Sequence, residues 1–317
     1  MKKFLTAGAI VALLLVLPLI SKRTDVLDLV LLFFLFSTLA QSWNILGGYT
    51  GQVSLGHAAF FGMGALVTRL LWEAGIPFAV AFIPGGIAAL ILSAIIGLPA
   101  LRLKGIYFAI GTLGLAMISR IMVGNILPTV SFMPAKQLAA YSLVPRYYVG
   151  LLLAVIINLV VFFLMNSKKG LGMLTVREDE EAAAAVGIDV FRHKVLALAL
   201  SSFFAGLAGS MYAYYYASYY YYVPFELGWC FDPLLIAFIG GVGTLTGPII
   251  GTIIFVVLRE VFTLTLGEAH IIIFGVIFIL IVFILPGGLI EAAGRGRRFL
   301  SVLLSKRMDS SSRKTID

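Results

Sequence analysis

Charged residues are scarce in this sequence. Lysine, arginine, aspartate and glutamate together make up 12% of its 317 residues, whereas an average soluble domain carries about 25%. Hydrophobic residues make up 61%, and the mean hydropathy is +1.06. A soluble protein of this length needs far more polar surface to cover its core. The composition therefore excludes a soluble globular domain and indicates that lipid surrounds most of the side chains.

Several chemical motifs are missing as well. The dipeptide Gly-Lys does not occur, so the sequence has no loop of the type that cradles nucleotide phosphates. It has neither the His-Glu-x-x-His pattern of zinc peptidases nor a nucleophile elbow. The single cysteine, Cys230, excludes an internal disulfide and a cysteine-cluster metal site. The sequence predicts no catalytic residue, no metal site and no cofactor held by this chain.

Apolar runs fill most of the sequence. A helix needs about 20 apolar residues to cross the hydrocarbon core of a bilayer. Ten such runs predict an all-α, polytopic transmembrane helical bundle of about ten spans with broken helices. The runs lie near residues 4–20, 26–46, 53–71, 79–98, 106–124, 147–165, 195–217, 231–245, 247–266 and 270–289. The first has the Lys2-Lys3 head of a signal peptide, but no small-residue cleavage pattern follows it, which favours a retained helix.

The positions of lysine and arginine predict the orientation in the membrane. With the N-terminus inside, sixteen of them fall on the cytoplasmic side and four outside, the bias expected from the positive-inside rule. Both termini are therefore predicted to be cytoplasmic. Because this bias explains the net charge of +8, the charge does not indicate a nucleic-acid partner. We divide the chain into a transmembrane domain, residues 1–294, and a basic cytoplasmic tail, residues 295–317.

One cytoplasmic segment, residues 168–194, differs from the rest. Its part TVREDEEAAAAVGIDVFRHK (175–194) carries eight charged residues. Thr175 and Glu178 have capping-box spacing, four alanines follow with high helix propensity, and Gly187 can end the helix in a left-handed turn. We expect a helix of about 11 residues whose small-residue face fits a groove in a partner protein. The alternative is a solvated connector between two spans.

Polar residues and glycines interrupt two apolar runs, at NILGGYTGQVSLGH (44–57) and GGVGTLTGPIIG (240–251). Non-helical backbone at membrane depth persists only where protein buries it or where it lines water, and broken helices bind substrates in many transporters. We therefore predict a substrate pathway formed by Asn44, Gln52, Ser54, His57, Gly240, Gly241 and Gly243. The alternatives are tight helix packing for the glycines and a satisfied polar side chain for His57. The two breaks occupy corresponding places in residues 26–124 and 195–290, which suggests repeated halves.

Charged side chains inside the predicted spans are few. We expect Arg259 and Glu260 to be buried against neighbouring helices or a partner subunit, and no ladder of acidic residues indicates proton coupling. The tyrosine-rich run 212–226 has two interpretations. It is either an aromatic belt at the membrane interface or a docking surface for an extracytoplasmic binding protein.

These motifs resemble those of a known family. EAAAAVG (181–187) matches the pattern Glu-Ala-Ala, three residues, then Gly, of ABC importer permeases. The whole chain resembles the branched-chain amino acid permease family, and within it the LivM-type subunit. The blocks that carry this resemblance are SWNILGGYTGQVSLGHAAFFGMGA (42–65), LRLKGIYFAIGTLGLA (101–116), VREDEEAAAAVGIDVFRHKVLALALSSFFAGLAGSMYA (176–213), FIGGVGTLTGPIIGTI (238–253) and LPGGL (285–289). The chain departs from the family at LPTVSFMPAKQ (127–137), where a glycine-rich stretch is usual, and at Gly287, where an arginine is usual.

The resemblance implies a non-catalytic permease in a prokaryotic plasma membrane, moving leucine, isoleucine or valine into the cell. It implies ATPase coupling through Glu181, Ala182, Ala183 and Gly187. The implied partners are a homologous LivH-type permease, two ATP-binding cassette subunits that hold ATP and Mg, an extracytoplasmic binding protein and membrane lipid. Three alternatives stay open: the same role for urea, an amide or another small solute; a self-sufficient secondary transporter or channel; and a membrane enzyme, which no motif supports.

Overall fold

The computed structural model describes residues 2–20, 23–266, 275–276 and 287–291. A helix lies at each of the nine predicted apolar runs that end by residue 266, so the all-α polytopic fold is confirmed. Most of the tenth run, 270–289, and the tail 295–317 lie outside the described residues. Among the described residues, five helical stretches are long and apolar enough to cross a membrane: Thr24–Gly48, Phe78–Ala100, Ile106–Ile126, Leu143–Met165 and Val190–Tyr215.

The secondary structure of the described residues is almost entirely helical. The α-helices are α1 (Lys2–Ile20), α2 (Thr24–Trp43), α3 (His57–Glu73), α4 (Phe78–Leu92), α5 (Leu98–Ala100), α6 (Ile106–Ile126), α7 (Ala135–Ala139), α8 (Leu143–Met165), α9 (Lys168–Glu178), α10 (Glu180–Ala185), α11 (Val190–Tyr215), α12 (Gly228–Gly240) and α13 (Gly247–Leu266). Two π-helical turns, η1 (Asn44–Gly48) and η2 (Ser93–Gly97), extend α2 and α4, and a 3₁₀ turn, η3 (Val223–Phe225), precedes α12. The strands are β1 (Val130–Phe132) and β2 (Ser218–Tyr220).

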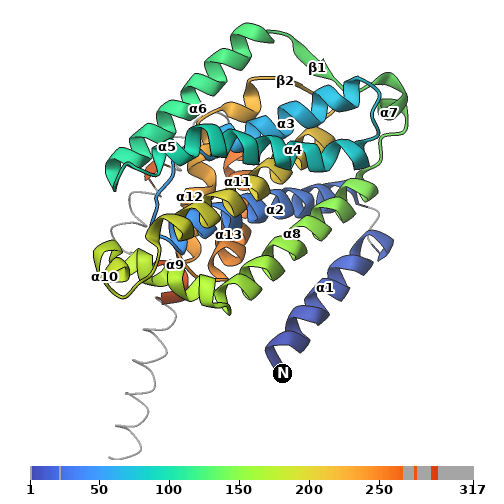
Figure 1. Cartoon of the computed structure of the whole chain (residues 1–317). Coiled ribbons are helices and arrows are strands. Elements are labelled where there is room, and N and C mark those ends of the chain that lie inside the picture. The colour runs from blue at the N-terminus through green and yellow to red at the C-terminus, as the bar shows by residue number, and fades with distance from the viewer. Residues whose placement is uncertain (1, 21–22, 267–274, 277–286, 292–317) are drawn as a thin grey trace, which may run out of the picture.

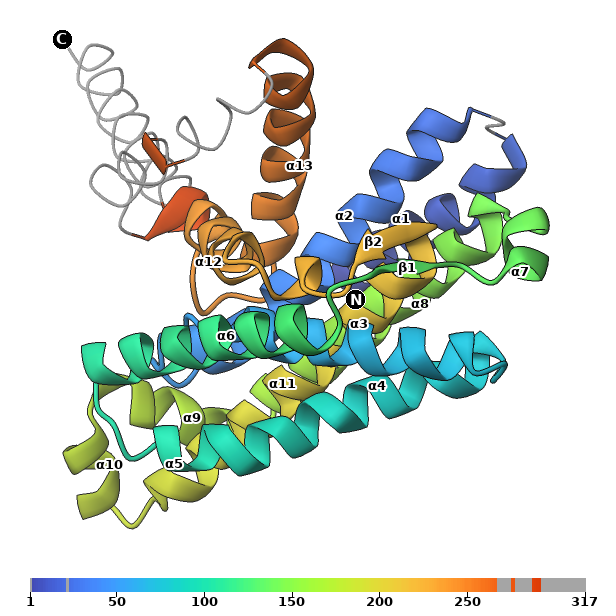
Figure 2. The ribbon, with the colours of Figure 1, turned by 90° about the horizontal axis from the view of Figure 1, so that it is seen from above.

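Helix α11 is central, with α2, α3, α4 and α8 packed around it (Figures 1 and 2). Glycines let α11 approach α3 closely: a Cβ atom on Gly64 would overlap the backbone of Gly206, and one on Gly209 would overlap the backbone of Phe61. In lipid, helices associate through such close contacts and through interhelical hydrogen bonds rather than through the hydrophobic effect. Packing therefore explains the small residues of this interface.

The two ends of the bundle differ in structure (Figure 1). At one end, here called the ribbon end, β1 pairs antiparallel with β2, and Ser131 lies opposite Tyr219. Strand β1 comes from the segment 127–137. The other end, the α10 end, carries α9, α10 and the connection between α5 and α6, which includes Arg102 and Lys104. Helix α8, 23 residues long, crosses between the ends over about 35 Å.

Two buried arginines close the ribbon end of α11. Arg146 Nε donates to the carbonyl of Tyr214 at 2.7 Å, and Arg69 Nη2 donates to the carbonyl of Tyr216 at 2.6 Å. Cations are favoured at the C-terminus of a helix, where the last carbonyls have no intrahelical partner. In the tyrosine run, Tyr212, Tyr219 and Tyr221 are buried, and Tyr220, which is 45% exposed, is the only exposed tyrosine of the described residues 212–222.

We predict that Gly209→Ala destabilises the bundle, because the new methyl group must displace the backbone of Phe61. Overpacking of this kind costs about 1–3 kcal/mol. The measurement is thermal unfolding of the detergent-solubilised protein. Gly114→Ala in α6 is the control, since nothing lies within 4 Å of a Cβ atom there. Equal unfolding temperatures for the two variants would contradict the packing account.

Candidate functional site: the α9–α10 segment and the helix breaks

The segment 168–194 begins with two separate helices. Asp179, between them, caps α10: its Oδ1 accepts hydrogen bonds from the amides of Glu181 at 2.8 Å and Ala182 at 3.0 Å. The predicted capping box is wrong, because the hydroxyl of Thr175 donates to the carbonyl of Leu171 inside α9. Helix α10 consequently has six residues rather than the predicted eleven or so. The predicted stop is confirmed, since Gly187 has φ +84° and lies just past Val186, the C-cap of α10.

Helix α10 presents small side chains at the surface. Ala183 is fully buried and anchors the helix, while Glu181, Ala182, Ala184 and Ala185 are exposed. Val186 follows with 73% exposure. The amides of Ala182 and Glu181 hold the pKa of the exposed Asp179 carboxyl below its usual range. The exposed face is therefore flat, mostly apolar and held in place by a charged cap.

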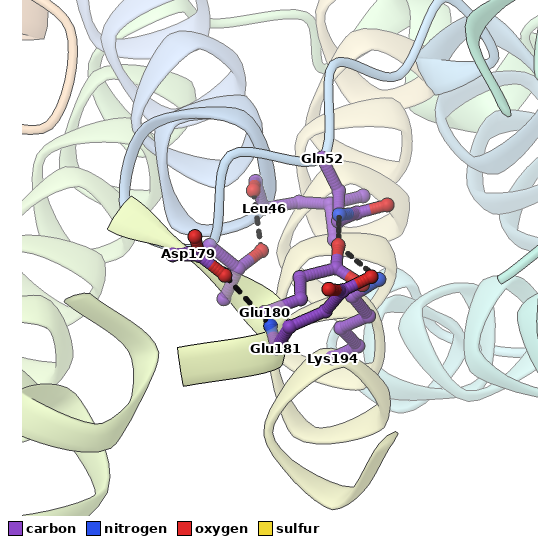
Figure 3. A network of polar contacts seen from close by, with 7 residues as sticks. Leu46, Gln52, Asp179, Glu180, Glu181 and Lys194 are labelled. Carbon is purple, nitrogen blue, oxygen red and sulfur yellow. Dashed lines mark hydrogen bonds and ion pairs between the residues drawn. The ribbon is translucent and has the colours of Figure 1, made fainter. Parts of the chain in front are cut away.

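An ion pair ties α10 to α11. Lys194 is 4% exposed, and its Nζ lies 2.5 Å from Glu180 Oε1. The same carboxylate oxygen accepts a hydrogen bond from Gln52 Nε2 at 3.1 Å. Figure 3 shows Gln52, Glu180 and Lys194 converging at this oxygen. Because Gln52 belongs to the first break, one carboxylate links α10, α11 and that break.

The two predicted breaks contact each other directly. The first opens with the π-helical turn η1, a geometry that is rare and often found at functional sites. Asn44 Nδ2 donates to the carbonyl of Thr244 at 2.9 Å, and Asn44 Oδ1 accepts from the amide of Gly243 at 2.8 Å. Gln41 Nε2 adds a bond to the carbonyl of Leu245 at 3.1 Å. Side chains of α2 and η1 thus satisfy backbone groups that the break before α13 leaves without helical partners.

Arg177, near the end of α9, reaches the same junction. Its Nη1 donates to the carbonyl of Gly48 at 2.8 Å. A Cβ atom on Gly243 would overlap the Arg177 guanidinium, and Gly243 has φ +75°, so only glycine fits there without strain. Helix α9 is therefore in contact with both breaks.

The remaining predicted pathway residues contact protein atoms. Ser54 Oγ accepts from the amide of Gly56 at 3.2 Å, and His57 Nε2 lies 2.8 Å from Ser201 Oγ in a fully buried position. A Cβ atom on Gly240 would overlap the backbone of Gly247. The structure thus brings Asn44 and Gly243 together, places Gln52 against α10, and leaves His57 on the α3–α11 side. Within the described ranges, no three His, Cys, Asp or Glu side chains gather where they could hold a metal ion.

Four residues of this site were absent from the sequence prediction. They are Gln41, Arg177, Glu180 and Lys194. The available signal was Lys194, which lies four residues past the start of α11 and directly before the apolar part of that helix, because a lysine there requires a partner when it is buried. The sequence does not identify which of the neighbouring acidic residues supplies that partner.

Comparison with known proteins places this arrangement in context. Residues 26–285 match the family described as branched-chain amino acid transport system / permease component. The chain belongs to this family. It is 27% identical to the high-affinity branched-chain amino acid transport system permease protein LivM of Escherichia coli, over 91% of this chain and 75% of that protein. It is 24% identical to the probable branched-chain amino acid transport permease protein LivM of Methanocaldococcus jannaschii, over 84% of this chain and 93% of that protein. No solved structure matches the chain.

The family assignment and the apolar helices agree. This permease is a multi-pass membrane protein of the LivM type, a membrane component of a transport system. The site described above is then a junction between two broken membrane helices and an exposed helical segment at one end of the bundle.

We predict that Asp179→Ala speeds amide hydrogen exchange at Glu181 and Ala182, because these amides lose their acceptor. Asp179→Asn is the control, since asparagine caps as well as aspartate. The carboxylate cap is present above the ordinary pKa of Asp179 and is lost as the pH falls through its depressed value in the folded protein. Unchanged exchange in the alanine variant would contradict the cap.

Proposed function

We propose that this permease is the membrane-spanning subunit of an ATP-driven importer that moves leucine, isoleucine and valine into the cell. The observation that carries the proposal is the exposed helix α10, whose Glu180 is joined to the first helix break through Gln52 and to α11 through Lys194. The curated LivM relatives, named as branched-chain amino acid permeases, support the substrate class.

In this proposal, partner subunits supply the energy for transport. The chain has no phosphate-binding loop, so two ATP-binding cassette subunits hold ATP and Mg and hydrolyse the nucleotide. Helix α10 offers Glu181, Ala182 and the exposed alanines to a groove in such a subunit, where small side chains allow close approach. Gly187 supports this role by ending the helix sharply.

Motion then passes along a contiguous set of contacts. A displacement of α10 moves Glu180 and, through its hydrogen bond, Gln52. A displacement of α9 moves Arg177, which contacts Gly48 and Gly243. These contacts end at the junction that Asn44 maintains between the two breaks. Coupling between distant sites needs such a physical network together with an element that has two arrangements. We assign that role to the two breaks, so in this proposal Asn44, Gln52 and Gly243 belong to the part that moves.

The remaining partners follow from the same proposal. A LivH-type permease completes the membrane domain, and an extracytoplasmic binding protein delivers the amino acid at the ribbon end. In a prokaryotic plasma membrane, the α10 end faces the cytoplasm, since Arg102, Lys104 and the basic residues of α9 lie there.

We predict that Glu181→Lys leaves the permease inserted but lowers leucine uptake in membrane vesicles and co-purification of the ATPase. Reversing a charge at a docked surface costs about 1.4 kcal/mol or more, which is a tenfold loss of affinity. Asp25→Lys, an exposed acidic residue at the ribbon end, is the control. Full uptake and full ATPase association in Glu181→Lys would contradict the coupling role and show that the segment 168–194 only connects two spans.

A second prediction concerns orientation. Ser142→Cys, before α8, and Ser167→Cys, before α9, should react with a membrane-impermeant thiol reagent from outside and inside respectively. Native Cys230 is buried and adds little background. Labelling of both variants from the same side of the membrane would overturn the proposed orientation.

A further inference from the structure

A cavity of about 620 Å³ lies between the ribbon end of α11, the start of α12 and the part of α13 that carries Phe255 and Arg259. Its volume falls within the roughly 300–1,000 Å³ typical of small-molecule sites. Its walls combine aromatic and aliphatic side chains with a few charged groups. None of the residues of the helix-break junction is among the described residues that line it.

Two of the three described charged residues that line the cavity form a pair, and the third, Glu226, lies 3.8 Å from Arg120. Arg259 on α13 and Asp232 on α12 both line the cavity, and Arg259 Nη1 lies 3.5 Å from Asp232 Oδ2. Their side chains stay 38% and 27% exposed. Nη1 is buried and has no hydrogen-bond acceptor among the described residues, because this ion pair lacks hydrogen-bonding geometry. Because the Arg259 side chain lines the cavity and stays partly exposed, the guanidinium fork can meet a ligand carboxylate there.

Aromatic rings hold the charged pair and the cavity wall in place. The Cζ of Arg259 lies 4.9 Å from the ring centre of Phe36. Trp229 stacks on Phe61 with ring centres 4.3 Å apart, and it also stacks on Phe36. Phe255 meets Phe36 edge to face. Trp229 and Phe255 line the cavity, so a rigid apolar wall lies beside the charged pair.

A ligand that suits both features carries a carboxylate, an ammonium group and an apolar side chain. We propose that this cavity binds a zwitterionic α-amino acid, with its carboxylate on Arg259, its ammonium group on Asp232 and its side chain against Trp229 and Phe255. Ionisable residues inside a membrane protein are costly, and those facing a cavity mark substrate pathways. The inference rests on the proposed function, and it places a binding step near the ribbon end, before the helix-break junction.

To test the site, we change the two charged residues of the pair and, as a control, a neighbouring residue of α13. Arg259→Gln removes the guanidinium, Arg259→Lys keeps the charge but loses the fork, and Asp232→Asn removes the ammonium partner. Glu260→Gln is the matched control, because Glu260 lies next in the chain but lines a different cavity. Binding of labelled L-leucine to the complete purified transporter, without the binding protein, gives the affinity of each variant. Uptake driven by the binding protein is measured in parallel.

We expect Arg259→Gln and Asp232→Asn to weaken leucine binding at least tenfold, with Arg259→Lys intermediate and Glu260→Gln unchanged. Competition by 4-methylpentanoate, which lacks the ammonium group, should depend on Arg259 but not on Asp232; competition by isoamylamine should show the reverse. If the wild type takes up leucine but all variants bind leucine equally well, the proposed site is wrong and the proposed function stands. Absence of leucine uptake by the wild-type transporter would overturn the proposed function and this site with it.

Discussion

The carboxylate of Glu180 is the contact on which the α10 end depends. Its Oε1 meets the buried ammonium group of Lys194 and the side-chain amide of Gln52 at once. Removing one partner of a buried ion pair costs about 3–5 kcal/mol, because the other charge stays desolvated. The pair therefore fixes α10 on α11 and, through Gln52, fixes the loop that follows the first break. A helix of six residues is too short to be stable alone, so α10 depends on this pair together with its Asp179 cap and buried Ala183.

A second constraint is that lipid offers no hydrogen bonds to exposed backbone. Both breaks leave amides and carbonyls without helical partners, and the chain satisfies them with polar side chains. Asn44 hydrogen-bonds to the backbone of Gly243 and Thr244. Gln41 donates to the carbonyl of Leu245, and Arg177 donates to the carbonyl of Gly48. The residues that close the breaks are thus also the ones that connect them. Movement of one break without the other would leave several polar groups without partners, which favours concerted motion.

Much of this architecture could be predicted from the sequence. Hydropathy located the nine long apolar helices up to residue 266 but not short ones such as α7, since the length of an apolar run is a local property. The stop at Gly187 was also local, and its φ of +84° agrees. The cap was misplaced because Thr175 and Asp179 are both good N-cap residues, and only the packing of α9 decides between them.

The sequence did not predict which residues far apart in the chain pair with each other. Asn44 was chosen for its polarity at membrane depth, yet its partners lie about 200 residues away in sequence. His57 was paired with Ser201 by the α3–α11 packing, and Glu180 was selected for Lys194 from four consecutive acidic residues. Periodicity and composition do not encode which of several chemically suitable partners the fold brings together.

The most direct test of the account is to replace the Glu180–Gln52 contact with a covalent one. In the variant that carries both Gln52→Cys and Glu180→Cys, leucine uptake and ATP hydrolysis by the complete transporter are measured before and after treatment with a short thiol-reactive linker. Because the linker restores the connection between α10 and the first break, the account predicts that weak, uncoupled uptake recovers on crosslinking. Normal uptake before treatment, or loss of uptake on crosslinking, would contradict the claim that α10 and the break move together.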